Sequence, residues 1–208
     1  EIVGNVTVAG FEPTIDYVVI KIPRFAFEKF PQANDRLTTQ MKSVGEVMSI
    51  GRTFQECLQK AIRGLEIGVC GFEEKTTDSD KIREEIIHPG PERLWYVADA
   101  FRVGMSQSEI YGLTGIDPWF LAEIEDLVSL EQKIRTVPLT AIDETDLKML
   151  KQKGFSDLRL AQLFGVHQDD VRALRHQFNV RPVYKRVDTC AGEFAATQCY
   201  FYSTYDEY

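Results

Sequence analysis

The sequence lacks the marks of a membrane protein and of a secreted protein held together by disulfides. No apolar run approaches the roughly 20 residues needed to span a bilayer, and there is no signal peptide or lipidation motif. The cysteines form no C-x-x-C pair, and the histidines lie in no metal-ligand spacing near them. These residues are Cys57, Cys70, Cys190, Cys199, His88, His167 and His176. A reducing cytoplasm is therefore the expected location.

Motifs for catalysis are missing as well. There is no phosphate-cradling glycine loop, no nucleophile–base motif and no metal-ligand pair. The formal net charge of -8 argues against a surface built wholly for nucleic acid or anionic lipid. With 208 residues, 44% of them hydrophobic, the chain is long enough for a real core in one large or two smaller domains. It begins without Met and enters a strand-rich region almost at once, which suggests a piece of something longer.

Residues 1–52 are predicted to be rich in β-strands. Ile15–Ile22 is a β-branched run that Pro23 stops, and Phe25–Phe30 alternates aromatic with other residues. A third strand is predicted around residues 41–51. Its alternation places one carboxylate in an otherwise apolar row, which consists of Val44, Glu46, Met48 and Ile50.

Glu46 is the most informative residue of this region. An unpaired buried carboxylate is costly, so it must be partnered, be protonated or face a wet cavity. One interpretation is a structural glutamate, either an outward member of a half-exposed strand or ion-paired to Arg24, Arg36 or Arg52. The other is a functional carboxylate. The residues alone leave both open.

After Arg52 the apolar spacing changes to the 3.6 residues of a helix. Thr53 with Glu56 predicts a capping box for a helix that ends near Gly68. The polar stretch 73–80 is the best domain boundary by composition, with a hinge within the preceding helix as the alternative, and six or seven helices are predicted between this stretch and residue 180. Their start and stop signals are Ser79, His88-Pro89-Gly90, Pro91, Gly104, Ser106 with Glu109, Asp117-Pro118, Pro138, Asp143, Gly154, Ser156 and Gly165.

The helical part has an uneven charge distribution. Residues 148–186 hold nine Lys/Arg against three Asp, whereas 117–146 hold eight Asp/Glu against two Lys/Arg. Such asymmetry suits either nucleic acid or the docking of one part of the protein on another. The pattern of residues 158–175 is typical of a helix-turn-helix. Asp169 and Asp170 at the start of its second helix argue against DNA binding, because a recognition helix approaches phosphates there. A helix-turn-helix-like nucleic-acid-binding module is therefore the alternative function.

Two further groups of residues have ordinary structural explanations. Trp95, Ala98 and Phe101 stand at helical spacing, which favours a packed core over a ligand pocket. The acidic residues Glu123, Glu125, Asp126 and Glu131 are expected to form a solvated helix face.

Six stretches carry a resemblance to a known family. They are FEPTIDY (11–17), KIPRF (21–25), LTTQMKSVGEVM (37–48), DPWFL (117–121), KGFSD (153–157) and RPVYKRVDTCA (181–191). Together they closely resemble the large chain of glutamine-dependent carbamoyl phosphate synthetase, and the match covers essentially the whole chain. That family has two homologous ATP-grasp halves separated by a helical oligomerisation domain.

The resemblance implies a mainly α fold preceded by a small α+β remnant of an ATP-grasp domain. Residues 1–63 would end the first, carboxyphosphate-forming half, 64–180 would be the oligomerisation domain, and 181–208 would be the connector toward the second half. The family makes carbamoyl phosphate from bicarbonate, glutamine-derived ammonia and two ATP, with Mg²⁺ or Mn²⁺ and K⁺, for arginine and pyrimidine synthesis. The expected partners are a glutaminase small subunit and further copies of the chain, with no nucleic acid and no membrane.

In the family, the ATP-binding and metal-binding positions lie upstream of Glu1. No catalytic, cofactor-binding or metal-binding residue is therefore expected in this segment, which should be inactive alone. Met41, Val44 and Glu46 match positions that line the internal tunnel for carbamate, an intermediate that decomposes in water. Such a passage must exclude bulk solvent and still offer some polar lining. Self-association is expected through apolar helix faces within residues 91–135 or 144–178.

Overall fold

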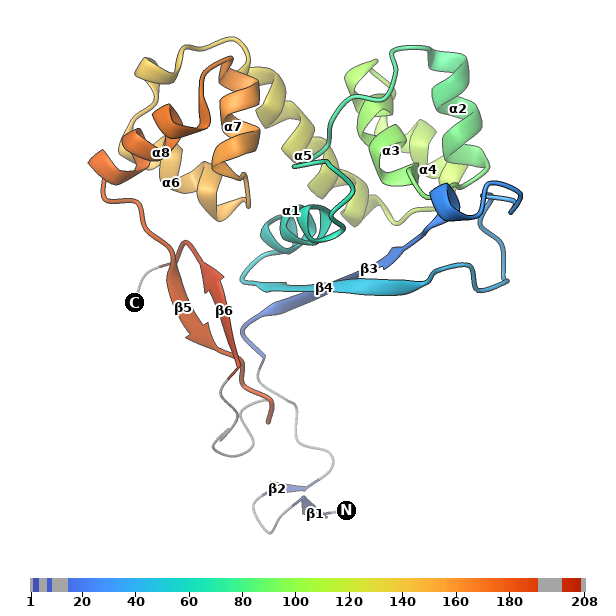
Figure 1. Ribbon diagram of the computed structural model, residues 1–208, viewed down its shortest axis with the longest axis horizontal. Helices are drawn as coiled ribbons and strands as arrows, with labels where there is room; N and C mark the ends of the chain where they lie inside the picture. The colour runs from blue at the N-terminus through green and yellow to red at the C-terminus, as the bar shows by residue number, and fades with distance from the viewer. Residues whose placement is uncertain (1, 4–6, 9–14, 191–199, 207–208) are drawn as a thin grey trace.

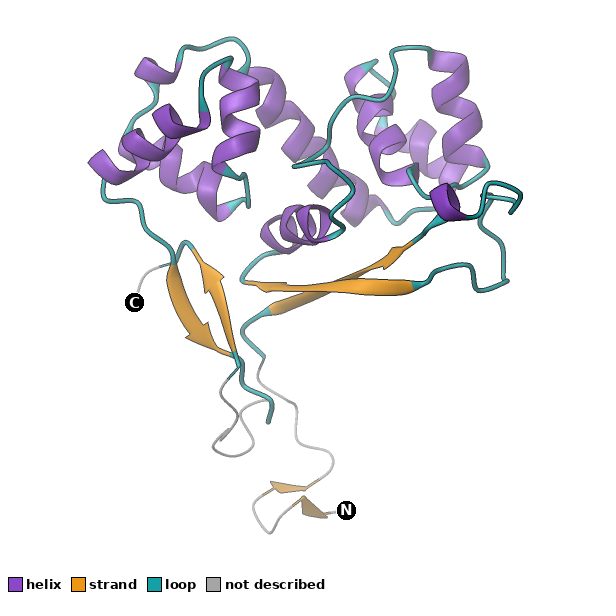
Figure 2. Cartoon of the chain, in the orientation of Figure 1, coloured by secondary structure: helices purple, strands orange, loops and turns teal. Residues whose placement is uncertain are grey.

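The computed structural model describes residues 2–3, 7–8, 15–190 and 200–206. Its helices lie on one side of a two-stranded antiparallel sheet, with a second strand pair beside it (Figures 1 and 2). The expected mainly α fold with a small α+β part is confirmed. The strands are β1 (Ile2–Val3), β2 (Thr7–Val8), β3 (Val18–Arg24), β4 (Gly45–Gly51), β5 (Val183–Arg186) and β6 (Phe201–Thr204). The helices are α1 (Phe54–Gly64), α2 (Ser79–Ile87), α3 (Arg93–Arg102), α4 (Gln107–Thr114), α5 (Pro118–Ile134), α6 (Glu144–Gln152), α7 (Asp157–Phe164) and α8 (Gln168–Gln177).

Strands β3 and β4 pair along their full length, from Val18 opposite Gly51 to Arg24 opposite Gly45. The sheet's inner face packs on α1 and the core, and Ile20, Ile22 and Val47 contribute to that packing. The register therefore sends the alternate side chains of both strands to the other, outer face.

The prediction of a strand at Phe25–Phe30 is wrong. Residues Phe27–Lys29 form a short 3-10 turn, in which the Lys29 amide donates to the Ala26 carbonyl at 2.9 Å. Aromatic alternation alone does not make a strand, because the pairing of β3 with β4 ends at Arg24 and leaves this segment without a partner. Pro23 does not stop β3 either, and a strand of a two-stranded sheet tolerates proline because it is an edge strand.

Most helix boundaries follow their capping signals. Ser106 and Glu109 form the predicted capping box, and Asp117 caps the 17-residue helix α5 with Pro118 at its first position. At Thr53 only half of the predicted box forms, because the Glu56 carboxylate accepts from the Arg52 amide instead. Helix α1 also ends at Gly64, before Gly68, and Asp78 rather than Ser79 caps α2.

The long helix α5 lies between two groups of helices, α2–α4 on one side and α6–α8 on the other (Figure 1). The predicted core residues Trp95, Ala98 and Phe101 are buried, and the Trp95 indole donates to the Gly71 carbonyl at 3.0 Å. Helix α1 is pressed against the turn that follows α6. A Cβ on Gly154, which has a φ of 92°, would lie 2.8 Å from the Glu56 Cα.

Glu131 is not part of a solvated face, which corrects the expectation for that residue. Its carboxylate is buried and receives two bonds of 2.8 Å from Arg159 on α7 and one of 2.8 Å from Arg102 on α3. The reason lies in the helical period, since Glu131 follows Ile124 and Leu127 on the apolar stripe that faces the core. One carboxylate of α5 thus ties the two helix groups together.

We predict that Glu131→Ala lowers the free energy of unfolding by about 3–5 kcal/mol, because it leaves the buried Arg159 guanidinium without its ion-pair partner and takes one of the carboxylates away from Arg102. Chemical denaturation monitored by circular dichroism measures this change. Glu123→Ala on the same helix is the control, with an expected effect within about 0.5 kcal/mol. Equal effects of the two substitutions would contradict the role of Glu131.

Candidate functional site

The outer face of the β3–β4 sheet is the first candidate site. Cross-strand neighbours on it are Val19 with Ile50, Lys21 with Met48, and Pro23 with Glu46. Val19 and Met48 are among the exposed large hydrophobic residues of the chain. A face that meets water in an antiparallel sheet is normally polar, whereas this face is mostly apolar with one carboxylate and one ammonium group.

The three residues matched to a tunnel are all exposed in this structure. Glu46 lies in β4, Val44 directly before it and Met41 in the preceding loop, and their exposed fractions include 61% for Val44 and 86% for Met41. Apolar side chains exposed to this degree next to an apolar strand face are typical of a surface that another part of a protein covers.

Glu46 has an ionic partner that the sequence analysis did not name. Lys21 Nζ lies 2.8 Å from Glu46 Oε1, and both side chains are 55% exposed. The three arginines that were considered as partners bind elsewhere, Arg24 to Glu28, Arg36 to Glu85 and Arg52 to Asp16. An ion pair this exposed adds little stability, so the pair itself does not explain why a carboxylate stands in this row.

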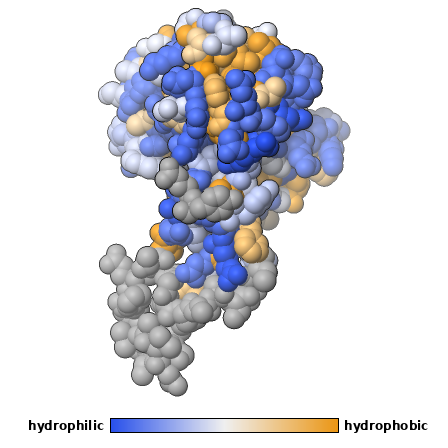
Figure 3. Space-filling view, turned by 90° about the vertical axis from the view of Figure 1, so that its left-hand side faces the viewer, coloured by the Kyte–Doolittle hydropathy of each residue, from blue (hydrophilic) through white to orange (hydrophobic). Residues whose placement is uncertain are grey.

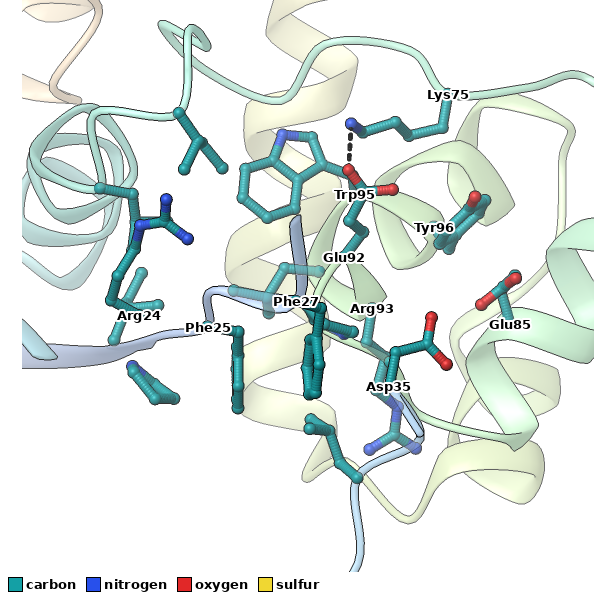
Figure 4. Close-up of a pocket in the computed structure, with 18 of the residues that line it drawn as sticks. Arg24, Phe25, Phe27, Asp35, Lys75, Glu85, Glu92, Arg93, Trp95 and Tyr96 are labelled. Carbon is teal, nitrogen blue, oxygen red and sulfur yellow. Dashed lines mark hydrogen bonds and ion pairs between the residues drawn. The ribbon is translucent and has the colours of Figure 1, made fainter. Parts of the chain in front are cut away.

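Among the described residues, β3 has no strand on its edge away from β4, and its residues line two hollows. One, of about 900 Å³, is lined by Val18 to Lys21 and by Trp119 and Phe120 at the start of α5. The other, of about 730 Å³, is lined by residues 22–25 together with α3 and the loop before it (Figure 4). An open strand edge with hollows beside it offers unpaired backbone groups to a further strand or chain segment.

The second hollow is apolar, and its charged groups are already engaged. Figure 4 shows Phe25 and Phe27 side by side, with ring centroids 5.8 Å apart and nearly parallel planes. Lys75 is ion-paired to Glu92 at 2.6 Å and lies over the Trp95 ring. The hollow therefore resembles a packing surface more than a catalytic centre, which would need free polar groups.

Aromatic side chains form a second exposed group at the start of α5. The rings of Phe54, Trp119 and Phe120 lie 5.1 to 5.3 Å apart, and Trp119 is 54% exposed. In the sequence, the DPWFL stretch stands out only through the family resemblance. The signal that could have found this group is its place in the first helical turn, where Trp119 and Phe120 precede the apolar stripe that begins at Leu121.

The described residues offer little for thiol or metal chemistry at Cys57 and Cys70, which are buried. Cys57, Cys70 and Cys190 are free thiols, and burial raises the pKa of Cys57 and Cys70 to about 12. No group of three or more His, Cys, Asp or Glu side chains in the described ranges could hold a metal ion. Cys199 and residues 11–14 of the first matching stretch lie outside the described residues.

The charge asymmetry of the helical part is used inside the protein. From the basic segment, Arg159 binds Glu131, and Lys153 binds Asp126 at 2.7 Å, both on the acidic helix α5. Lys151 and Arg175 share Asp157, at 2.8 and 3.2 Å. Of the two uses that the sequence left open, internal docking is the one that these contacts support.

On the face that Figure 3 shows, the helical part is mostly hydrophilic and is interrupted by an apolar area. Over the helical part as a whole, the exposed large hydrophobic residues include Leu158 on α7 and Tyr111 on α4. Among the helices that the structure describes, none has the length and apolar character required to cross a membrane.

Comparison with known proteins identifies a single family. Residues 46–179 match the family model described as carbamoyl-phosphate synthetase large chain, oligomerisation domain. The chain is 59% identical over 207 residues to the carbamoyl phosphate synthase large chain of Haemophilus ducreyi, and all of this chain is covered. It is 61% identical over 212 residues to that of Pseudomonas syringae pv. tomato and 60% over 206 residues to that of Ralstonia nicotianae, covering 100% and 99% of this chain. The alignments cover 19%, 20% and 19% of these relatives, so the chain spans about a fifth of their length.

The Asp157 cluster predicts a dependence of stability on pH. Burial opposes the charged form of Asp157, but the Lys151 ammonium and the Arg175 guanidinium outweigh it and lower the pKa of this carboxyl. A carboxyl with a lowered pKa stabilises the fold above its unfolded pKa, about 3.9, and this stabilisation is lost as the pH falls through the folded pKa. The unfolding free energy should therefore fall at acid pH, and less steeply in Asp157→Asn.

Denaturant titrations across the acid range measure this slope. Asp80→Asn, at an exposed position on α2, is the matched control and should keep the wild-type slope. If Asp157→Asn and Asp80→Asn follow the same curve, the cluster does not provide the pH-dependent stabilisation.

Proposed function

The chain belongs to the carbamoyl-phosphate synthetase large chain family, and from this premise we propose that it joins the end of a first synthetase half to the oligomerisation domain. The whole protein would be an ATP-dependent ligase that makes carbamoyl phosphate from bicarbonate, glutamine-derived ammonia and two ATP, for arginine and pyrimidine synthesis. A glutaminase small subunit would supply the ammonia. ATP, Mg²⁺ or Mn²⁺, and K⁺ would bind the whole protein outside this segment, which would be inactive alone.

The single observation that supports this placement best is the incompleteness of the β3–β4 sheet. Two strands are marginal as an independent unit, and a sheet needs a covering layer on each apolar face. Helix α1 covers the inner face, while in the part of the chain that the structure describes the outer face with Val19 and Met48 stays exposed and β3 has no second strand neighbour. The remainder of an ATP-grasp half would supply both the cover and the neighbouring strand.

The same face supports a tunnel role for Met41, Val44 and Glu46. Once the outer face is covered, these side chains would lie between two layers, in a mostly apolar passage with a single carboxylate. Carbamate needs protection from bulk water and some polar contacts on its way, and such a wall would provide both. The Lys21–Glu46 pair shows that the carboxylate lies within reach of a cation from the neighbouring strand.

Self-association is the role that we propose for the helical part. Exposed apolar residues stand in both segments expected to associate, with Tyr111, Trp119 and Phe120 in 91–135 and Leu158 in 144–178. Exposed apolar patches commonly mark protein–protein contacts. For the alternative, a nucleic-acid-binding module, the internal ion pairs of the basic segment leave less free charge for phosphates.

We predict that Glu46→Gln or Met41→Trp in the full-length enzyme raises the amount of ATP hydrolysed per carbamoyl phosphate formed. The physical reason is that carbamate would escape or decompose when the passage is blocked or loses its carboxylate. Measuring ADP and carbamoyl phosphate in the same reaction gives the ratio of ATP hydrolysed to carbamoyl phosphate formed. Glu144→Gln, at an exposed position on α6, is the control. An unchanged ratio in both variants would exclude the tunnel role.

We also predict that the chain self-associates with rising concentration, which multi-angle light scattering measures. Trp119→Glu with Phe120→Glu tests the first segment and Leu158→Glu the second, because a charge in an apolar contact weakens it. Only the variant whose substitution lies in the self-association contact should shift the chain toward the monomer. A monomeric wild-type chain at high concentration would refute the proposal, and salt-dependent binding of random duplex DNA would favour the alternative.

A further inference from the structure

A buried carboxylate on α1 connects two segments that lie far apart in the sequence. Glu56 Oε2 accepts from the Arg52 amide at 2.8 Å, where β4 turns into α1. The same atom accepts from the Thr204 hydroxyl of β6 at 3.1 Å, across a separation of 148 residues. The Glu56 side chain is 2% exposed, so both bonds are shielded from water.

Lys60 supplies the counter-charge one helical turn later. Its Nζ lies 3.0 Å from Glu56 Oε1, at ion-pair distance, and this oxygen has no hydrogen-bond partner of its own. The same ammonium donates to the Ile50 carbonyl of β4 at 2.9 Å and to the Ser203 carbonyl of β6. One side chain therefore satisfies backbone groups of both strands and neutralises the buried carboxylate.

Further contacts attach the β5–β6 pair to the rest of the protein. The Tyr17 hydroxyl, ahead of β3, donates to the Asp188 carbonyl at 3.1 Å. Arg52 Nε lies 3.2 Å from the Asp206 carboxylate. On the helical side, the Lys151 ammonium lies 5.1 Å from the centre of the Tyr205 ring. The strand pair therefore touches both the β3–β4 region and the helices.

We propose that Glu56 and Lys60 are positioning residues which clamp β5–β6 to β4 and α1, so that this strand pair is a fixed brace and not a loose tail. Two strands of four residues are not stable on their own, so their order must come from what they contact. The contact of Glu56 and Lys60 with β6 fixes one position of the strand pair, because a buried charge pair is favourable only when both partners and their hydrogen bonds are in place.

The brace closes a ring in the chain. Strand β4 leads into α1 and the helices, the helices lead to β5, and β6 returns to β4 through Glu56 and Lys60 (Figure 1). Segments on either side of the helical part would then move as one body. If the proposed function holds, and only then, a displacement beyond the helices would reach the strand that carries Glu46.

Hydrogen–deuterium exchange of the protein tests the clamp directly and does not depend on the proposed function. Lys60→Met removes the charge and the donors, and it should speed exchange in a peptide covering 200–206 by about tenfold or more, because local opening becomes easier. Lys60→Arg keeps a charge and donors and should retain most of the protection. Lys81→Met, at an exposed position on α2, is the matched control and should exchange like the wild type.

A second pair of variants covers the case in which Lys60→Met loosens the whole fold, which faster exchange in α5 would reveal. Thr204→Val replaces the hydroxyl with a methyl group of similar size, whereas Thr204→Ser keeps the donor to Glu56. Faster exchange of residues 200–206 in Thr204→Val than in Thr204→Ser supports the clamp. Equal exchange in these two, equal exchange in Lys60→Met and Lys81→Met, or an unprotected wild-type β6 overturns it.

Discussion

The bidentate pair between Glu131 and Arg159 is the interaction on which the helical part depends. Arg102 joins the same carboxylate and also binds Asp99 at 2.7 Å, so two cations and two anions balance in a cluster whose members Asp99, Glu131 and Arg159 are buried. Both guanidinium groups donate to the Phe72 carbonyl, which belongs to the linker between α1 and α2. The cluster thereby places α3, α5, α7 and the linker relative to one another in a way that apolar packing alone would not specify.

The same principle applies to two other contacts between elements. Lys151 and Asp157 hold the start of α7 against the end of α6, and Lys60 and Glu56 hold β6 against β4. Each pair is largely withdrawn from water, so that a shifted arrangement would leave a charge without its partner. Two elements joined only by apolar contacts can shift relative to each other at less cost than two elements joined by a buried ion pair. The protein thus uses hydrophobic area for its core and charges for the register between its parts.

Local signals in the sequence predicted what depends on local chemistry. The capping box at Ser106, the start of α5 at Asp117 and the left-handed glycine after α7 each involve a few neighbouring residues. Side-chain partners that come from distant parts of the chain could not be predicted from the sequence. Lys21 meets Glu46 only through the register of β3 on β4, and Glu56 meets Thr204 only because the chain returns to α1 after 148 residues. The assignment of Met41, Val44 and Glu46 to a tunnel came from family resemblance, since strand alternation shows a face and not what covers it.

The helical part and the β3–β4 sheet differ in how completely the chain itself pairs their charges and covers their apolar faces. In the described helical part, the buried charges at Glu131 and Asp157 find their partners within the chain. The β3–β4 sheet has one face covered by α1, and its outer face carries Met48 in the open. A chain segment whose core is closed and whose sheet is open is suited to carry a surface that another domain completes. If a second layer covers this sheet, as we propose, the brace through Lys60 would serve a physical purpose, because it would hold the sheet in a fixed position before that layer meets it.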